Sequence, residues 1–142
     1  MKENFLLLLI LLFTSCATYY IPVDSFKEQF SGIDSTKLIE VTVIGPGAIL
    51  QRYLANPITM IHCVDKNGEP HQLRNSPSIE TRFTYGYKNK RAVLYFDRIY
   101  VDSVAITGVQ SRFVELGKTI PLDSITKIEI QDGKKDFKYT LQ

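Results

Sequence analysis

The chain of 142 residues has no tryptophan, two cysteines, two histidines and no apolar run longer than nine residues. A helix that spans a bilayer needs about 20 largely apolar residues, so we expect no permanent membrane-spanning helix. So few cysteines and histidines provide no evident set of ligands for a closed zinc site. The formal net charge of +2 gives no argument for a nucleic-acid partner. We therefore expect no cofactor, no metal and no nucleic acid.

The nine-residue apolar run, residues 5–13, has the features of a secretory signal. Lys2 precedes it, and the small polar residues Thr14 and Ser15 follow it. A buried core helix is the alternative, but a segment that is apolar on every side at the N-terminus fits a signal sequence better.

The end of this segment, Phe13-Thr14-Ser15-Cys16, resembles the lipobox of bacterial lipoproteins, with Phe13 where an aliphatic residue is usual. The resemblance implies that the Cys16 thiol receives a diacylglycerol, that the chain is cut before Cys16 and that the new amino group is acylated. It implies a signal peptide at 1–15, a lipidated tether at 16–23 and one β-rich domain at 24–142. Cleavage by ordinary signal peptidase, which leaves a soluble secreted protein, is the alternative.

The lipobox resemblance also has implications for the membrane to which the protein is sorted and for the second cysteine, Cys63. The two residues that follow Cys16 are Ala17 and Thr18, and neither is an aspartate. By the same resemblance this implies sorting to the outer membrane, on the leaflet facing the periplasm. If Cys16 carries lipid, Cys63 has no disulfide partner, and its apolar surroundings predict a buried thiol. If Cys16 is not lipidated, a Cys16–Cys63 bridge is the alternative.

The mature chain predicts a mainly β fold. Its hydrophobic content is 44%, with eight Tyr and eight Phe, which is typical of a globular domain. One short helix is expected at 24–31, with a capping box between Ser25 and Glu28 and with Phe26 and Phe30 facing the core. We expect an antiparallel small barrel or sandwich of about eight short strands. The stretches that indicate strands are 38–44, 57–64, 71–74, 79–87, 91–101, 103–106, 112–116, 119–122, 125–130 and, at an edge, 137–141.

Two details refine this prediction. The stretch 91–101 has apolar residues on both faces, which favours a central strand covered on both sides. Residues 117–130 resemble the closing strands of several uncharacterised small β-rich envelope proteins, and this resemblance carries no functional residue.

One group of residues suggests chemistry: His62, Cys63, Asp65 and His71. Successive strand residues point to opposite faces, so His62 and Cys63 are not expected to share a centre. His71 is expected to approach His62 across a hairpin, but no third metal ligand is evident. The sequence has no Gly-x-Ser-x-Gly elbow and no phosphate-binding loop, so it names no catalytic, cofactor-binding or metal-binding residue.

The sequence therefore predicts a membrane-anchored lipoprotein of the bacterial cell envelope that acts as a noncovalent accessory or scaffold component. Its partners would be the membrane, through the lipid on Cys16, and an envelope protein. A β-barrel binding module for a lipid or a saccharide is the alternative, and a small envelope hydrolase is the third hypothesis. An enzyme is possible on composition, but no motif supports one.

Overall fold

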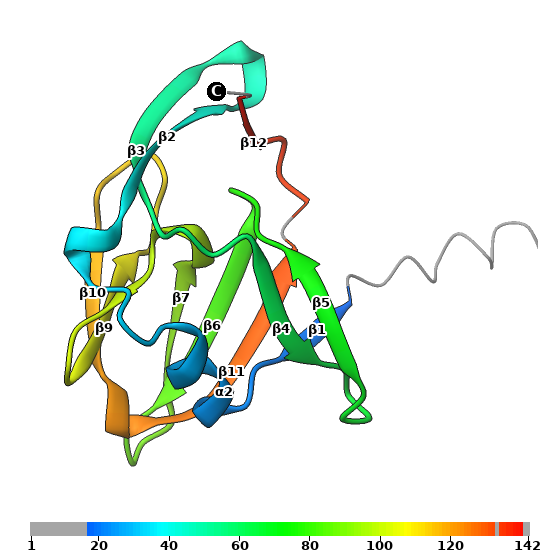
Figure 1. Ribbon diagram of the computed structural model, residues 1–142, viewed down its shortest axis with the longest axis vertical. Helices are drawn as coiled ribbons and strands as arrows, with labels where there is room; N and C mark the ends of the chain where they lie inside the picture. Colours follow the sequence, from blue (N-terminus) through cyan, green and yellow to red (C-terminus); the bar gives the residue numbers. More distant parts are fainter. Residues whose placement is uncertain (1–16, 133, 141–142) are drawn as a thin grey trace, which may run out of the picture.

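The computed structural model describes residues 17–132 and 134–140. The expected signal peptide at 1–15, the lipid attachment residue Cys16 and the end of the expected edge strand at 137–141 lie outside the described residues. The described chain forms three antiparallel sheets and a short helix in a sandwich-like arrangement (Figure 1). The predicted mainly β fold with one N-terminal helix is confirmed.

The elements alternate short strands with tight connections. In chain order they are β1 (Thr18–Tyr20), α2 (Val23–Gln29), η2 (Ser35–Lys37), β2 (Ile39–Ile44), η3 (Pro46–Ala48), β3 (Leu50–Ala55), β4 (Met60–Val64), β5 (Pro70–Arg74), β6 (Ile79–Tyr85), β7 (Lys90–Tyr95), η4 (Phe96–Arg98), β8 (Tyr100–Val101), β9 (Ala105–Val109), β10 (Gly117–Pro121), η5 (Leu122–Ser124), β11 (Ile125–Asp132) and β12 (Lys138–Tyr139), where η marks a 3-10 turn.

The largest sheet has the strand order β5-β4-β1-β11-β6-β7. Within the described residues β5 and β7 are its edges, so the sheet does not close on itself, and the barrel alternative is wrong. The prediction of one central strand over residues 91–101 is also wrong. The chain leaves the sheet at η4, β7 is an edge strand, and Val93 on its outer face is exposed. The apolar residues of β7 on the inner face, such as Leu94, are buried, whereas Val93 on the outer face is not.

The strand β1 lies in the middle of this sheet, between β4 and β11. Thr18 pairs with Gln131, and Tyr20 pairs with both Glu129 and Val64. These residues fall within the segment that the sequence assigned to a tether. Only Ala17 separates Cys16, which lies outside the described residues, from Thr18, the first residue of the folded sheet. The body of the domain therefore begins almost at the proposed lipid.

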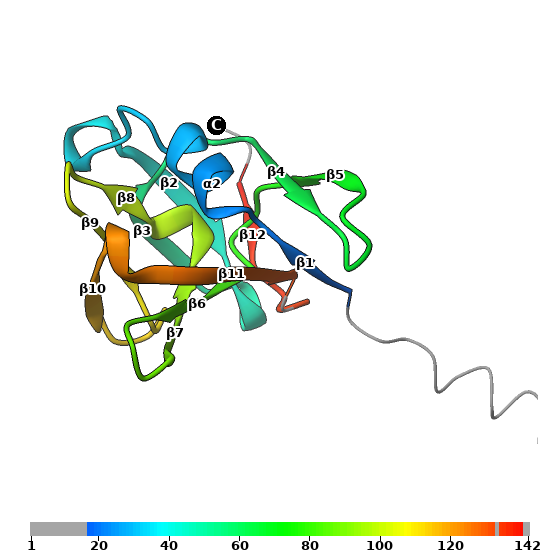
Figure 2. The same ribbon diagram turned by 90° about the horizontal axis from the view of Figure 1, so that it is seen from below.

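The helix α2 packs over β4 and β11 (Figure 2). Phe26 and Phe30 are fully buried as predicted, and the ring of Phe26 meets the edge of Phe83 at 5.5 Å between centroids. The predicted capping box is wrong, because the helix begins after Pro22 and Ser25 lies inside it. The Ser25 hydroxyl instead accepts a hydrogen bond from the Gln29 side chain at 3.1 Å.

Two small sheets complete the fold: β10-β9-β8 and β12-β2-β3. In the second, β2 and β3 form a long hairpin that extends away from the main sheet, with β12 along its other edge (Figure 1). β12 is an edge strand, as expected for residues 137–141. The sequence reading missed β3, in which Tyr53 and Ala55 face inward while Leu50, Arg52 and Leu54 face solvent.

The apolar core has a large and a small part. The large part joins α2 to the main sheet and to β9 and β10, and the small part lies under the β2–β3 hairpin and contains Val43, Tyr53, Ala55 and Phe137. Within residues 17–132 and 134–140, no helix is long and apolar enough to cross a membrane.

Candidate functional site

A carboxylate without exposure to solvent lies between the two cores. Asp97 is in the middle of η4, and 0% of its side chain is exposed. Asn56 fixes this turn: its backbone N–H donates to the Asp97 carbonyl at 2.7 Å, and its side-chain amide donates to the carbonyls of Phe96 and Ile99. The turn therefore places Asp97 where the hairpin meets the main sheet.

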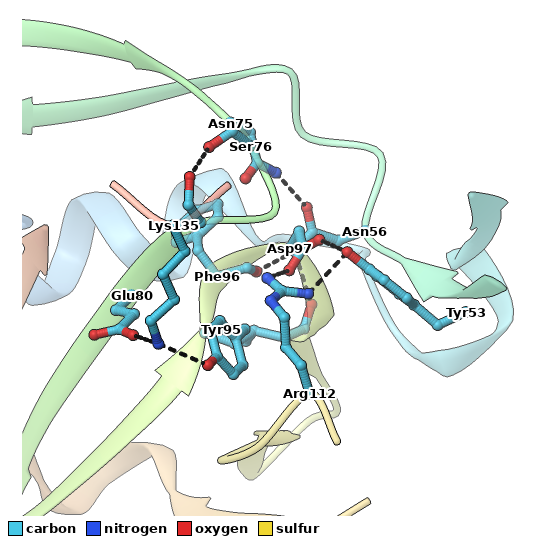
Figure 3. A network of polar contacts seen from close by, with 12 residues as sticks. Tyr53, Asn56, Asn75, Ser76, Glu80, Tyr95, Phe96, Asp97, Arg112 and Lys135 are labelled. Atoms are coloured by element: carbon cyan, nitrogen blue, oxygen red, sulfur yellow. Dashed lines mark hydrogen bonds and ion pairs between the residues drawn. The ribbon is translucent and has the colours of Figure 1, made fainter. Parts of the chain in front are cut away.

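Arg112 neutralises this buried carboxylate. It lies in the loop between β9 and β10, its side chain is 1% exposed, and its Nη2 donates to Asp97 Oδ1 at 3.1 Å (Figure 3). The guanidinium carbon lies 3.9 Å from the centroid of the Tyr95 ring. A buried charge is tolerated when it is paired and hydrogen-bonded, and this geometry supplies both conditions.

Two tyrosine hydroxyls complete the set. Tyr53 from β3 and Tyr139 from β12 both donate to Asp97 Oδ2, the second at 2.9 Å. Tyr53 also accepts from Arg112 Nη1 at 2.9 Å. Burial, and then the nearby charge of Asp97, raises the pKa of both phenols well above its ordinary value. We name Tyr53, Asp97, Arg112 and Tyr139 the arginine clasp.

The arginine clasp links parts of the chain that are far apart in sequence. It joins β3 and β12 of one small sheet to η4 and to the β9–β10 loop, which lie outside that sheet. Neither phenol ionises near neutral pH, and both oxygens of Asp97 already accept hydrogen bonds. The clasp has no free base and no nucleophile, so its geometry supports a positioning role and not catalysis.

What the arginine clasp positions is the β9–β10 loop, residues 110–116. The sequence predicted a strand over residues 112–116, and this prediction is wrong. The Ser111 hydroxyl accepts from the N–H groups of Phe113 and Val114, which turns the backbone, and Arg112 points inward. Phe113 is consequently 79% exposed, and Val114 and Leu116 are also exposed. The loop therefore exposes large apolar side chains to solvent while the Arg112 side chain anchors it to the core.

A groove of about 440 Å³ lies beside this loop. Its wall includes Leu54, Tyr100 and the pair Arg98 and Glu115, whose side chains meet at 3.2 Å. Arg98 also lies over the Tyr53 ring, with 4.7 Å between its guanidinium carbon and the ring centroid. The loop and the groove together present apolar groups with a charged pair at their rim.

A second cleft, of about 250 Å³, lies under the β2–β3 hairpin. Its walls are mostly apolar, with Val41 and Ile58 among them, and Tyr139 of the arginine clasp also lines it. The side-chain oxygen of Asn75 is buried at this cleft with no hydrogen-bond partner among the described residues.

The residues that the sequence singled out for chemistry do not form a site. Cys63 is buried and His62 is exposed, so their opposite orientation is confirmed. His71 pairs in register with Cys63 and not with His62, so the expected approach of the two histidines is wrong. Its ring nitrogen lies 3.3 Å from Asp65. No group of three or more His, Cys, Asp or Glu residues in the described chain could hold a metal ion.

The histidine–carboxylate pair has a structural explanation. Asp65 begins the β4–β5 turn and accepts the backbone N–H groups of Asn67 and Glu69, and these bonds lower the pKa of its carboxyl. Burial raises the pKa of the neighbouring Cys63 thiol to about 11, so the thiol is protonated at neutral pH. The pair therefore lacks an activated nucleophile, and the hydrolase hypothesis gains no support.

We expect the Cys63 thiol to react slowly with a disulfide reagent such as Ellman's reagent while the protein is folded. With the pKa at about 11, roughly one thiol in a thousand is ionised at pH 8, so the rate should rise about tenfold per pH unit up to pH 10. Because the folded pKa is raised, the thiol stabilises the fold fully below its unfolded pKa, and this contribution is lost as the pH rises toward 11. The measurement compares native protein with protein in urea.

The urea sample also tests the disulfide alternative. One thiol per chain should titrate there, because Cys16 is lipidated in our hypothesis and Cys63 is free in the structure. No reactive thiol in urea would instead support the Cys16–Cys63 bridge, and equal rates in both samples would contradict burial.

No family model matches this chain, and no curated protein or solved structure is significantly similar to it. The functional argument therefore rests on the geometry of the chain itself. The sequence analysis missed Asp97 and Arg112, although one signal was present: Asp97 and Arg98 interrupt an otherwise apolar stretch, residues 92–101, where a buried charge needs a partner.

Proposed function

We propose that this protein is a membrane-anchored lipoprotein of the bacterial cell envelope that acts as a noncovalent accessory or scaffold component, with residues 110–116 as its partner-binding loop. In this proposal the lipid on Cys16 holds the domain at the inner leaflet of the outer membrane, facing the periplasm. The bound partner is an envelope protein.

The observation that carries the proposal is the exposure of Phe113 on a loop whose neighbouring residue, Arg112, is bound to Asp97 in the core. Aromatic residues are enriched among the residues that dominate protein–protein affinity, and contiguous exposed apolar groups mark interaction sites. The neighbours Val114 and Leu116 extend the apolar surface, and the Arg98–Glu115 pair supplies a charged rim. Because the arginine clasp fixes the loop in advance, binding costs little conformational entropy.

The lipobox supports the membrane part of the proposal. Two or three acyl chains give stable membrane attachment, whereas one chain gives only reversible binding. In the structure the folded sheet begins at Thr18, so a lipid on Cys16 would hold the domain close to the bilayer.

Replacing Phe113 and Val114 together by serine should reduce recovery of the partner by at least about tenfold, because a buried aromatic anchor contributes about 2 kcal/mol or more to binding. The tagged lipoprotein is purified from detergent-solubilised envelopes, and the proteins that copurify are quantified by mass spectrometry. The double variant should keep the unfolding midpoint of the parent, since both side chains are exposed.

The matched control is Val104→Ser, which removes an equally exposed aliphatic side chain in the connection between β8 and β9. Its copurifying proteins should match those of the parent. Recovery of the tagged protein alone from the parent sample, or an unchanged set of partners with the double variant, would count against the proposal.

A second candidate function is binding of a small lipid or saccharide in the cleft under the hairpin. The buried Asn75 oxygen without a partner favours it, since a ligand N–H or O–H group would satisfy this acceptor. At about 250 Å³ the cleft is smaller than most ligand sites, and the barrel that this alternative assumed is absent from the described chain. We therefore place this candidate second.

A further inference from the structure

A second exposed apolar feature lies at the tip of the β2–β3 hairpin. Residues 44–50, Ile-Gly-Pro-Gly-Ala-Ile-Leu, contain no polar side chain over seven consecutive positions. Ile49 and Leu50 are 61% and 63% exposed, and Ile44 is exposed as well. We name residues 44–50 the hairpin tip.

The hairpin tip has a fixed shape. The Gly45 N–H donates to the Ile49 carbonyl at 2.8 Å, which closes the turn. Gly45 is buried against the Phe137 ring so closely that a Cβ there would lie 2.7 Å from a ring carbon. The apolar residues of the tip are therefore presented to solvent by a braced turn.

Two basic side chains flank this tip. Lys138 lies opposite Ile44 in the β12–β2 pair, Arg52 follows Leu50 on the same face of β3, and both are exposed. Lys134 and Lys135 precede β12, and Lys135 already binds Glu80 at 2.5 Å. Glu80 therefore offsets the charge of Lys135, and the two basic side chains placed beside the tip by the strand pairing are Lys138 and Arg52. An apolar tip with a basic rim matches the chemistry of an anionic lipid surface.

The hairpin tip also lies within reach of the proposed anchor. Thr18 pairs with Gln131, and Ile44 pairs with Lys138, so the two points are seven positions apart along the chain. Gln131 and Lys138 are therefore at most about 25 Å apart. Figure 1 shows the segment 134–139 between the end of β11, which pairs with β1, and the β2–β3 hairpin. The exposed Phe113 loop belongs to a different part of the fold, between β9 and β10.

We infer that the hairpin tip inserts into the lipid headgroup region of the membrane that holds the lipid on Cys16, as a second point of contact that fixes the orientation of the domain. This inference rests on the proposed function for the lipid anchor. The Ile44, Ile49 and Leu50 side chains enter the boundary of the acyl chains, and Lys138 and Arg52 contact lipid phosphates. The Phe113 loop is then left free for a protein partner.

The absence of tryptophan allows a direct test, because one introduced indole gives the only tryptophan fluorescence. The variant Ile49→Trp is purified in its lipidated form and reconstituted into vesicles of phosphatidylcholine and phosphatidylglycerol. The indole at position 49 should show blue-shifted emission and several-fold stronger quenching by lipids brominated on their acyl chains than the indole of Val104→Trp. Because interfacial segments lie about 5–10 Å deep, bromine placed high on the acyl chain should quench most.

The outcomes separate this inference from the proposed function. Cosedimentation with vesicles reports the lipid anchor, and quenching reports the hairpin tip. If both variants cosediment with vesicles but the indole at position 49 is no better quenched than that at 104, the inference is wrong while the anchor stands. A blue shift that appears only with native envelopes points to a protein on the tip, and one that depends on protein density points to a second copy. Both of these results contradict membrane insertion.

Discussion

Replacing Asp97 by alanine should lower the free energy of unfolding by about 3–5 kcal/mol, because the change leaves the Arg112 guanidinium buried without its counter-ion. The hydroxyls of Tyr53 and Tyr139 lose the same acceptor, and a buried donor without a partner is itself destabilising. With a urea dependence of about 2 kcal/mol per M, the unfolding midpoint should fall by roughly 2 M. Urea titration followed by far-UV circular dichroism measures this shift.

Milder variants keep the test informative if the alanine variant does not fold. Tyr139→Phe removes one hydrogen bond and should cost only about 0.5–1.5 kcal/mol. The matched control is Asp123→Ala, which removes an exposed carboxylate 3.5 Å from Lys27 and should leave the midpoint almost unchanged. Equal midpoints for Asp97→Ala and Asp123→Ala would show that the arginine clasp does not hold the fold.

A double-mutant cycle addresses the link between the arginine clasp and the loop. When Asp97→Ala is combined with Arg112→Leu, the loss should be smaller than the sum of the two single losses, because no unpaired charge remains. If Arg112 positions the β9–β10 loop, the double variant should also bind the partner less well than the parent even where its stability is largely restored. A purely stabilising role would leave partner recovery unchanged.

The sequence predicted the parts of this fold that depend on local chemistry. Asn67-Gly68 forms the β4–β5 turn with Gly68 at a φ of 81°, and Phe26 and Phe30 bury one face of the helix. Residues 125–130 form most of β11, where Ile125, Ile128 and Ile130 are buried on the core side. In each case the preferred backbone conformation and the burial pattern agree.

The sequence failed where long-range contacts override local pattern. Nothing in residues 112–116 indicates that Arg112 pairs with a carboxylate 15 positions earlier, and that pair turns an expected strand into a loop. Likewise, β3 is missed because its outer face keeps Leu50 and Leu54 exposed, which blurs the alternation of polar and apolar residues. Candidate interaction residues such as Phe113 and Ile49 were overlooked for the same reason, since exposure is decided by the assembled fold.

The anchor prediction follows from the sequence alone, and a variant of Cys16 tests it. Replacing Cys16 by alanine should remove the acceptor for the diacylglycerol, abolish labelling with an azido fatty acid and move the protein from the membrane fraction to the soluble fraction. The effect should be large, because each buried methylene of an acyl chain contributes about 0.8 kcal/mol to membrane binding. In the inferred orientation the three Ile and Leu side chains of the hairpin tip would bury far fewer carbons, so they should orient the domain without retaining it alone.

An insertion provides the matched control for this variant. Because Thr18 is already in the sheet, a flexible Gly-Ser segment of ten residues placed between Cys16 and Ala17 should leave lipid labelling and membrane retention intact. The same insertion should weaken the quenching of an indole at position 49, since the longer tether relaxes the coupling between the lipid and the hairpin tip. Intact-mass analysis of the native protein that finds an unmodified thiol at Cys16 would contradict the anchor, and with it the membrane orientation.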